Sequence, residues 1–122
     1  MTLNILAIDD SRTIRELLKQ ALGNAGFNVT TADDGVEGCE TFARIDADVV
    51  ITDINMPRMD GFGVIETIRG GDTNVTVPIL VLTTESGDDL KARARSAGAT
   101  GWIVKPFDDA ALISALKRVA GA

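Results

Sequence analysis

Five side chains in this sequence have the types and positions to do chemistry together. Each follows a short apolar segment: Asp9 and Asp10 the first such segment, Asp53 the third, Thr83 the fourth and Lys105 the fifth. If these segments are parallel strands, their carboxyl ends meet at one edge of a sheet, where the ligands of such sheets bind. Three carboxylates would then lie close together, with a hydroxyl and an ammonium group beside them.

Three carboxylates at one edge favour a bound cation. Two like charges about 4 Å apart repel by about 4 kcal/mol at an effective dielectric constant near 20, so such a cluster binds a cation or holds a raised pKa. The chain has no histidine, and carboxylate oxygens without histidine or thiolate favour Mg²⁺, or else Mn²⁺, over zinc. The expected cofactor is Mg²⁺, with Lys105 offsetting part of the negative charge.

Phosphoryl transfer to a carboxylate is the reaction that these groups support. A carboxylate beside Mg²⁺ can attack phosphorus in line while the metal and an ammonium group neutralise the equatorial oxygens. Asp53 is then the nucleophile, and Asp9 and Asp10 hold the metal.

Each of these residues also has an ordinary structural explanation when taken alone. Asp10 with Ser11 could cap a helix, and Asp53 could be a loop acid before a proline-containing turn. Thr83 could be a strand hydroxyl bonded to backbone, and Lys105 a surface residue. All of these explanations would have to hold together at the strand ends of one sheet, so we favour the chemical hypothesis.

Short apolar segments predict the strands that position these residues. Four of the five are continuous runs, as in strands buried on both faces, whereas residues 27–32 mix polar and apolar positions, as at the edge of a sheet. Helical spacing of apolar residues separates them, and Ser11 is the expected N-cap of the first helix. The expected strands lie at residues 5–8, 27–32, 49–51, 79–82 and 102–104, and the expected helices within 14–25, 36–43, 62–68, 90–97 and 112–120.

This alternation predicts an α/β fold with a doubly wound, five-stranded parallel sheet, because parallel neighbours need a helical crossover. A length of 122 residues without repeat or linker corresponds to a single domain, residues 1–122. The helix after Ser86 has few apolar positions beyond Leu90, Ala94 and Ala97. We expect it to pack weakly and to move readily.

The composition narrows the partners and the compartment. A formal net charge of -6 disfavours nucleic acid and anionic membranes as partners. The absence of histidine excludes a Ser/His/Asp triad and a histidine phosphocarrier. The lone Cys39 forms no internal disulfide, and no apolar run approaches the roughly 18 residues that span a bilayer. We expect a soluble, cytoplasmic protein, and a monomer.

The whole pattern resembles the receiver domain of two-component response regulators, most closely the stand-alone receivers of chemotaxis. The resemblance covers essentially the full chain and implies a flavodoxin-like (βα)5 fold with strand order 2-1-3-4-5. The residues that carry it are Asp9-Asp10, the segment from Ile51 to Gly61 that contains Asp53 and Met56-Pro57, Thr83, and Lys105-Pro106-Phe107.

The resemblance implies a role for each residue of the site. Asp53 would be the phospho-acceptor, Asp10 a direct Mg²⁺ ligand and Asp9 a ligand largely through water. Asn55 would offer its backbone carbonyl, so that the implied metal set is Asp9, Asp10, Asp53 and Asn55. Asn55 and Glu85 also stand where relatives tune the lifetime of the phosphoryl group, by positioning or polarising the attacking water.

The switch residues follow from the same resemblance. Thr83 would bond a phosphoryl oxygen through its hydroxyl, and Lys105 would pair with another, with Pro106 in the cis form. Trp102 stands where relatives usually carry Tyr or Phe. Movement of Thr83 toward the phosphate would vacate space for the Trp102 ring and remodel the neighbouring surface; as a packing residue of an edge strand, Trp102 would not move.

The implied function is signalling rather than turnover chemistry. A histidine kinase would donate its phosphoryl group to Asp53, and the protein would catalyse only its own phosphorylation and dephosphorylation. Without an output domain it would act by docking, on a flagellar motor switch protein as chemotaxis receivers do. A phosphate sink and a phosphorelay intermediate are the alternatives within this class.

Two other classes are disfavoured by single residues. An aspartyl phosphatase needs a second acid two residues after its nucleophile, where this chain has Asn55. A flavodoxin-type carrier needs a hydroxyl-rich or glycine-rich phosphate loop after the first strand, where this chain has Asp9 and Asp10.

Overall fold

Five strands alternate with five helices in the part of the chain that the computed structural model describes, residues 2–121. The strands are all parallel, in the order β2-β1-β3-β4-β5, which confirms the predicted fold class and strand order. The elements are β1 (Asn4–Ile8), α1 (Arg12–Asn24), β2 (Asn28–Ala32), α2 (Gly35–Phe42), β3 (Val49–Thr52), α3 (Gly61–Arg69), β4 (Ile79–Thr83), α4 (Asp88–Ala97), β5 (Gly101–Val104) and α5 (Asp109–Val119).

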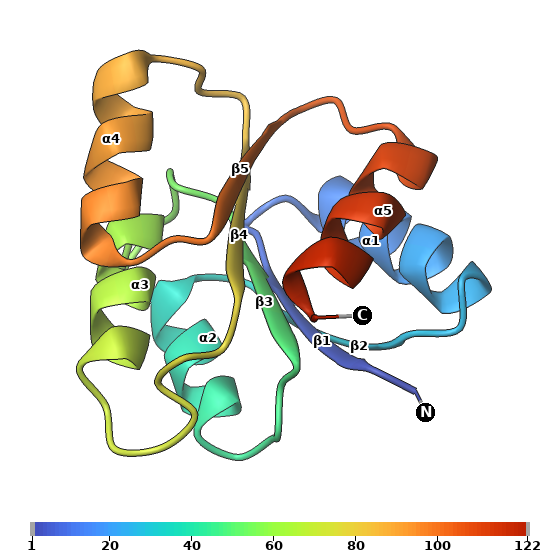
Figure 1. Ribbon diagram of the computed structural model, residues 1–122, viewed down its shortest axis with the longest axis horizontal. Helices are drawn as coiled ribbons and strands as arrows, with labels where there is room; N and C mark the ends of the chain where they lie inside the picture. The colour runs from blue at the N-terminus through green and yellow to red at the C-terminus, as the bar shows by residue number, and fades with distance from the viewer. Residues whose placement is uncertain (1, 122) are drawn as a thin grey trace.

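The sheet separates two apolar cores, and Figure 1 shows it nearly edge-on between two layers of helices. Helices α2, α3 and α4 cover one face, and α1 and α5 cover the other. Because side chains alternate along a strand, Leu6 and Ile8 of β1 pack with the first group, and Ile5 and Ala7 with the second. Because all five strands are parallel, their carboxyl ends meet at one edge of the sheet, toward the top of Figure 1.

The edge strands differ from the three central ones. All residues of β3 and β4 are buried, as the apolar runs predict. The prediction that β5 is buried on both faces is wrong: Gly101, Trp102 and Ile103 are half-buried and Val104 is 40% exposed. β5 pairs only with β4, so it is an edge strand, as β2 is on the other side.

Helix α4 is less firmly built into the fold than the other helices. Its N-cap, Gly87, makes no side-chain hydrogen bond, whereas Ser11 caps α1 as predicted, and Ala94 is its one residue described as buried. Two arginines make contacts between α4 and α3, Arg69 from α3 and Arg93 from α4 itself. The guanidinium group of Arg69 donates to the Gly98 carbonyl at 3.0 and 2.8 Å, and that of Arg93 lies 3.9 Å from the centre of the Phe62 ring.

Within the described residues, none of the helices is long and apolar enough to cross a membrane.

Candidate functional site

The three predicted acids meet at the carboxyl edge of the sheet. Asp9 follows β1 and Asp53 follows β3, which is hydrogen-bonded to β1 in parallel register. Carboxylate oxygens of Asp9, Asp10 and Asp53 lie within 4.8 Å of one another. Asp9 is 2% and Asp53 7% exposed, whereas Asp10 is exposed to solvent. The site is therefore a partly buried acidic cluster with one side open.

Lys105 enters the cluster from the end of β5. Its Nζ lies 2.8 Å from Asp9 Oδ2 and 2.9 Å from Asp53 Oδ2. The backbone N–H of Lys105 donates to the carbonyl of Thr83 at 2.8 Å, which fixes the start of the side chain. The Lys105–Pro106 peptide is cis, as predicted. Lys105 is thus a half-buried ammonium group that bridges two buried carboxylates, not a surface lysine.

The other carboxylate oxygens of the buried pair are held by backbone N–H groups. Ser11 N–H donates to Asp9 Oδ1 at 2.9 Å, and Ile54 N–H donates to Asp53 Oδ1 at 2.6 Å. Both carboxylates are therefore fixed in rotation, with Oδ2 turned toward Lys105. This arrangement follows from the chain path, because each acid is the first residue after a strand and the next turn supplies the donor.

Burial and charge act in opposite directions on this pair. Burial raises the pKa of Asp9, and the hydrogen bond from Lys105 lowers it by less, so the pKa of Asp9 stays above its ordinary value. Burial lowers the pKa of Lys105, but the bonds and charges of Asp9 and Asp53 together outweigh it and raise that pKa. Lys105 is therefore held charged.

The donor set fits a divalent cation of the Mg²⁺ type. Asp9, Asp10 and Asp53 offer only hard oxygen donors, and these lie within 4.8 Å of one another, close enough to surround one ion directly or through its water ligands. Three carboxylates against one ammonium leave surplus negative charge at a site that is partly removed from water, which a cation would offset. Asp10 leaves an open side for water ligands.

Thr83 lies at the end of β4 and is fully buried. Its Oγ1 accepts a long hydrogen bond, 3.4 Å, from the backbone N–H of Glu85. Glu85 is in turn tied to the loop after the acid cluster, because Asn55 Nδ2 donates to Glu85 Oε1 at 3.1 Å. The two residues predicted to tune dephosphorylation therefore touch each other, a contact that their sequence separation does not reveal.

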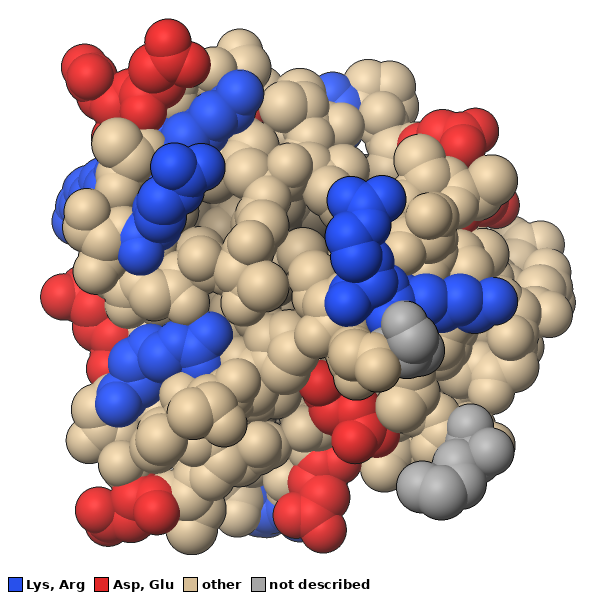
Figure 2. Space-filling model, in the orientation of Figure 1, with Lys and Arg blue, Asp and Glu red and all other residues tan. Residues whose placement is uncertain are grey.

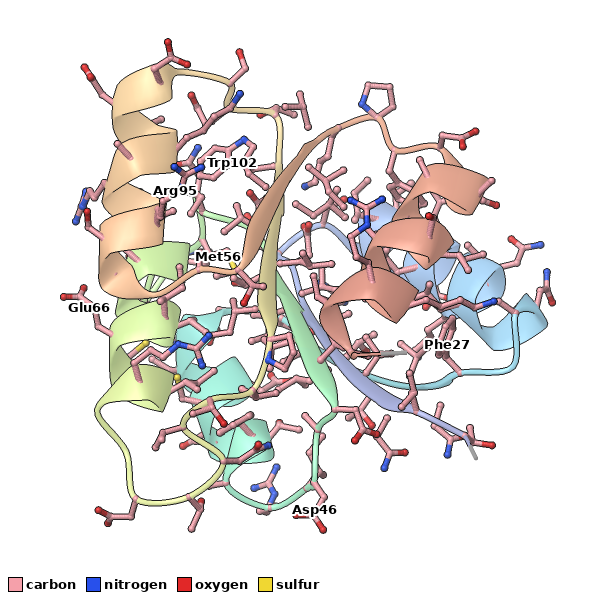
Figure 3. All side chains as sticks on the ribbon, in the orientation of Figure 1. Phe27, Asp46, Met56, Glu66, Arg95 and Trp102 are labelled. Carbon is pink, nitrogen blue, oxygen red and sulfur yellow. The ribbon has the colours of Figure 1, made fainter. Side chains whose placement is uncertain are left out.

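Trp102 is connected to the loop between β4 and α4, which contains Glu85. Its indole Nε1–H donates to the backbone carbonyl of Glu85 at 3.0 Å. Figure 3 shows the ring between β5 and α4, with Arg95 beside it. Trp102 thus joins the segment that follows Thr83 to the outer surface of the protein.

The loop between Asp53 and α3 is packed too closely to admit added atoms. Gly61 N–H donates to the Ile54 carbonyl at 2.9 Å, and a Cβ at Gly61 would overlap the backbone carbonyl of Asp53. A Cβ at Gly35, the first residue of α2, would likewise overlap the Met59 carbonyl. The glycines therefore set how the backbone turns away from Asp53.

Sequence reasoning missed one residue at this edge, Arg15. Its guanidinium group donates to the backbone carbonyl of Asp9 at 2.8 Å from the second turn of α1. The sequence gives no signal for it, because a polar residue outside the apolar stripe of an amphipathic helix reads the same whether it is solvated or, like Arg15 at 15% exposure, packed against backbone.

Comparisons with known proteins agree with this geometry. The sequence model of the response regulator receiver domain matches residues 5–117. The chemotaxis protein CheY-3 of Vibrio cholerae is 37% identical over 118 residues, covering 96% of this chain and 91% of that protein. The solved structure of Vibrio cholerae chemotaxis protein CheY4 is 40% identical with a TM-score of 0.93, covering 98% of this chain and 99% of that one.

A more distant structure was solved with a metal. It is the receiver domain of the sensor histidine kinase PA1611 from Pseudomonas aeruginosa, with a magnesium ion coordinated in its active-site cleft. It is 26% identical, with a TM-score of 0.91 over 100% of both chains.

The family match spans every residue of the site from Asp9 to Lys105. The relatives share the length of this chain as well as its fold. This chain belongs to the response regulator receiver domain family.

Proposed function

We propose that this receiver accepts a phosphoryl group on Asp53, with Mg²⁺, from the phosphohistidine of a histidine kinase, and signals by binding a partner in the phosphorylated form. Receivers of this kind take phosphoryl groups from histidine kinases and bind Mg²⁺ at an acidic cluster. The observation that carries the proposal is the cluster itself: three carboxylates within 4.8 Å, two of them bridged by Lys105.

The proposed reaction is in-line displacement at phosphorus. A carboxylate oxygen of Asp53 attacks, the bond from phosphorus to the histidine nitrogen breaks, and the electron pair leaves with the imidazole, which takes up a proton. Bound Mg²⁺, held by Asp9, Asp10, Asp53 and the Asn55 carbonyl, would neutralise phosphoryl oxygens. Lys105 lies 2.9 Å from Asp53 and pairs with a further phosphoryl oxygen, and the Thr83 hydroxyl donates to another.

We further propose that the protein is a signalling receiver and not a turnover enzyme. The alkoxide leaving group of a phosphomonoester would need a general acid, and the residue two positions after Asp53 is Asn55, which donates to Glu85. Glu85 is half-buried, and its carboxylate accepts the hydrogen bond from that amide. In this proposal the Asn55–Glu85 pair orients the water that later hydrolyses the acyl phosphate.

The surface formed by α4, β5 and α5 is the proposed docking face. Figure 2 shows basic side chains over α4 and over α5, with an uncharged strip between them along β5. Lys91 and Arg95 border a groove on one side of Trp102, and Arg118 borders a groove on the other. On a chain of net charge -6, this local excess of positive charge suits an acidic partner segment. The proposed partner is a flagellar motor switch protein, supported by the similarity to chemotaxis receivers.

The test of phosphoryl acceptance is the intact mass of the protein after incubation with a small acyl phosphate. We expect a gain of one phosphoryl group that requires Mg²⁺ and disappears in Asp53→Asn. If the small donor fails, a phosphorylated kinase domain replaces it. Failure with both donors would contradict the proposal.

Binding of a motor switch peptide distinguishes signalling to the motor from the two alternative functions, a phosphate sink and a phosphorelay intermediate. We expect tighter binding by the phosphorylated form than by the unmodified form. Equal binding together with return of the phosphoryl group to a phosphotransfer protein would indicate a relay intermediate, and rapid hydrolysis without either would indicate a phosphate sink.

Trp102 allows the switch to be followed directly, because it is the only tryptophan in the sequence. Its indole is bonded to the Glu85 carbonyl, two residues after Thr83, so movement of that segment changes the surroundings of the ring. We expect phosphorylation to change both the emission of Trp102 and its quenching by acrylamide. Unchanged emission and quenching in a fully phosphorylated sample would show that Trp102 is only a packing residue.

A further inference from the structure

Arg15 contacts the acidic cluster through the backbone carbonyl of Asp9 and not through a carboxylate of the cluster. Its Nη1 donates to the Asp9 carbonyl oxygen at 2.8 Å, and its Nη2 lies 3.5 Å from Asp33 Oδ1. The Arg15 side chain is 15% exposed, whereas that of Asp33 is 64% exposed. Arg15 therefore joins the turn after β1 to the turn after β2, with its charged group largely removed from water.

The atom that Arg15 holds belongs to the peptide unit between Asp9 and Asp10. A trans peptide unit is planar, so fixing its carbonyl oxygen also fixes the direction in which the chain enters the next residue. Asp9 is already restrained by its N–H, which donates to the Ala32 carbonyl at 3.1 Å, and by the bonds of its carboxylate to Ser11 N–H and Lys105. Asp10 is exposed, so the restraint on its backbone sets the position and direction from which its side chain reaches the other two acids.

We propose that Arg15 is a positioning residue for the metal site: it orients the Asp9–Asp10 peptide so that the Asp10 carboxylate faces the other two acids. This inference rests on the proposed function, in which Asp10 is a direct ligand of Mg²⁺. The planar guanidinium group suits the role, because it donates to a backbone oxygen and meets a carboxylate at the same time in a fixed geometry.

The direction in which Mg²⁺ affinity changes when Arg15 is removed distinguishes a positioning role from an effect of its charge. A cation behind the cluster repels Mg²⁺, so if Arg15 acted through charge alone, its removal would strengthen Mg²⁺ binding. If Arg15 acts by positioning, removal weakens binding. Partners outside the ligand shell typically change metal affinity 10-fold or more, which exceeds the effect of one charge that Asp33 partly offsets.

The experiment is calorimetric titration of the full chain with Mg²⁺. We expect Arg15→Gln and Arg15→Met to raise the dissociation constant for Mg²⁺ by about 10-fold. Arg15→Lys should recover part of the affinity, because its ammonium group can donate to the same carbonyl. Arg12→Gln is the matched control: it removes the same charge from an exposed position of the same helix and should leave the affinity unchanged or slightly higher, the sign expected of charge alone.

Two further measurements separate positioning from a general structural role. At saturating Mg²⁺ the maximal phosphorylation rate of Arg15→Met should lie within about twofold of the wild type, because Arg15 touches no reacting atom. Thermal unfolding without Mg²⁺ shows whether each variant is folded. If Arg15→Gln and Arg15→Met do not fold, the Mg²⁺ affinity of Arg15→Lys tests the inference instead.

The outcomes distinguish the inference from the function on which it rests. If the wild type binds Mg²⁺, and folded Arg15→Gln and Arg15→Met bind it as tightly or more tightly, the positioning role is overturned. The proposed function then remains intact. A wild-type chain that binds no Mg²⁺, like an Asp10→Asn control, would contradict the proposed function and the role of Arg15 with it.

Discussion

Lys105→Met is expected to slow phosphorylation of Asp53 by about 100-fold or more, the usual effect of removing a group that stabilises developing charge. It should also lower the free energy of unfolding in Mg²⁺-free buffer by about 3 kcal/mol, because breaking a buried ion pair from one side leaves the other charge without compensation. Here two carboxylates lose their partner, at 2.8 and 2.9 Å.

The stability effect should depend on Mg²⁺ in a characteristic way. A cation bound by the carboxylates replaces the missing ammonium charge, so Mg²⁺ should stabilise Lys105→Met more than it stabilises the wild type. Urea unfolding with and without Mg²⁺ measures both differences. Lys19→Met, which removes an exposed lysine of α1, is the matched control and should change neither quantity appreciably.

An unchanged stability of Lys105→Met without Mg²⁺ would contradict the electrostatic account of the cluster. It would mean that Asp9 and Asp53 do not depend on Lys105 for neutralisation, and that the lysine serves only the phosphorylated state.

Gly61→Ala should be a strongly damaging single-methyl change at the site. The new Cβ would overlap the carbonyl of Asp53 and come within 2.9 Å of the Ile54 Cα. Both contacts are backbone, so rotation of a side chain cannot relieve them, and we expect a loss of about 3 kcal/mol in the free energy of unfolding. Because the contact is with the phospho-acceptor residue itself, the phosphorylation rate should fall as well.

Gly23→Ala is the control for the glycine substitution. Gly23 lies within α1 with nothing within 4 Å of an added Cβ, so alanine should raise stability by about 0.5 kcal/mol through its better helix propensity. Denaturant unfolding of the two variants should therefore give opposite signs. A Gly61→Ala protein as stable as the wild type would show that the turn after Asp53 adjusts freely.

The elements and the main site were predictable because they depend on local patterns. Continuous apolar runs define β3 and β4, and the polar residues at the ends of the strands are placed by the rule that parallel strands end at one edge. Asp9, Asp10, Asp53 and Lys105 could be brought together on paper without any knowledge of side-chain conformation.

The contacts that depend on tertiary geometry were not predictable. The bond from Asn55 to Glu85 and the bond from Arg15 to Asp9 join polar residues whose spacing follows no period. The apolar run of β5 predicted burial on both faces, because such a run looks the same in a central strand and in an edge strand; only the strand order implied by the resemblance put β5 at the edge. For Arg69, the sequence shows a basic residue at the end of a helix but not that it reaches the Gly98 carbonyl after α4.

The most direct test of the account locates the phosphoryl group chemically. After incubation with an acyl phosphate and Mg²⁺, the protein is reduced with borohydride, which converts an aspartyl phosphate to homoserine, and its peptides are sequenced by mass spectrometry. Homoserine is expected at position 53, only in the sample that contained Mg²⁺. Homoserine at position 9 or 10, or a phosphoryl group on a hydroxyl side chain that resists reduction, would contradict Asp53 as the acceptor.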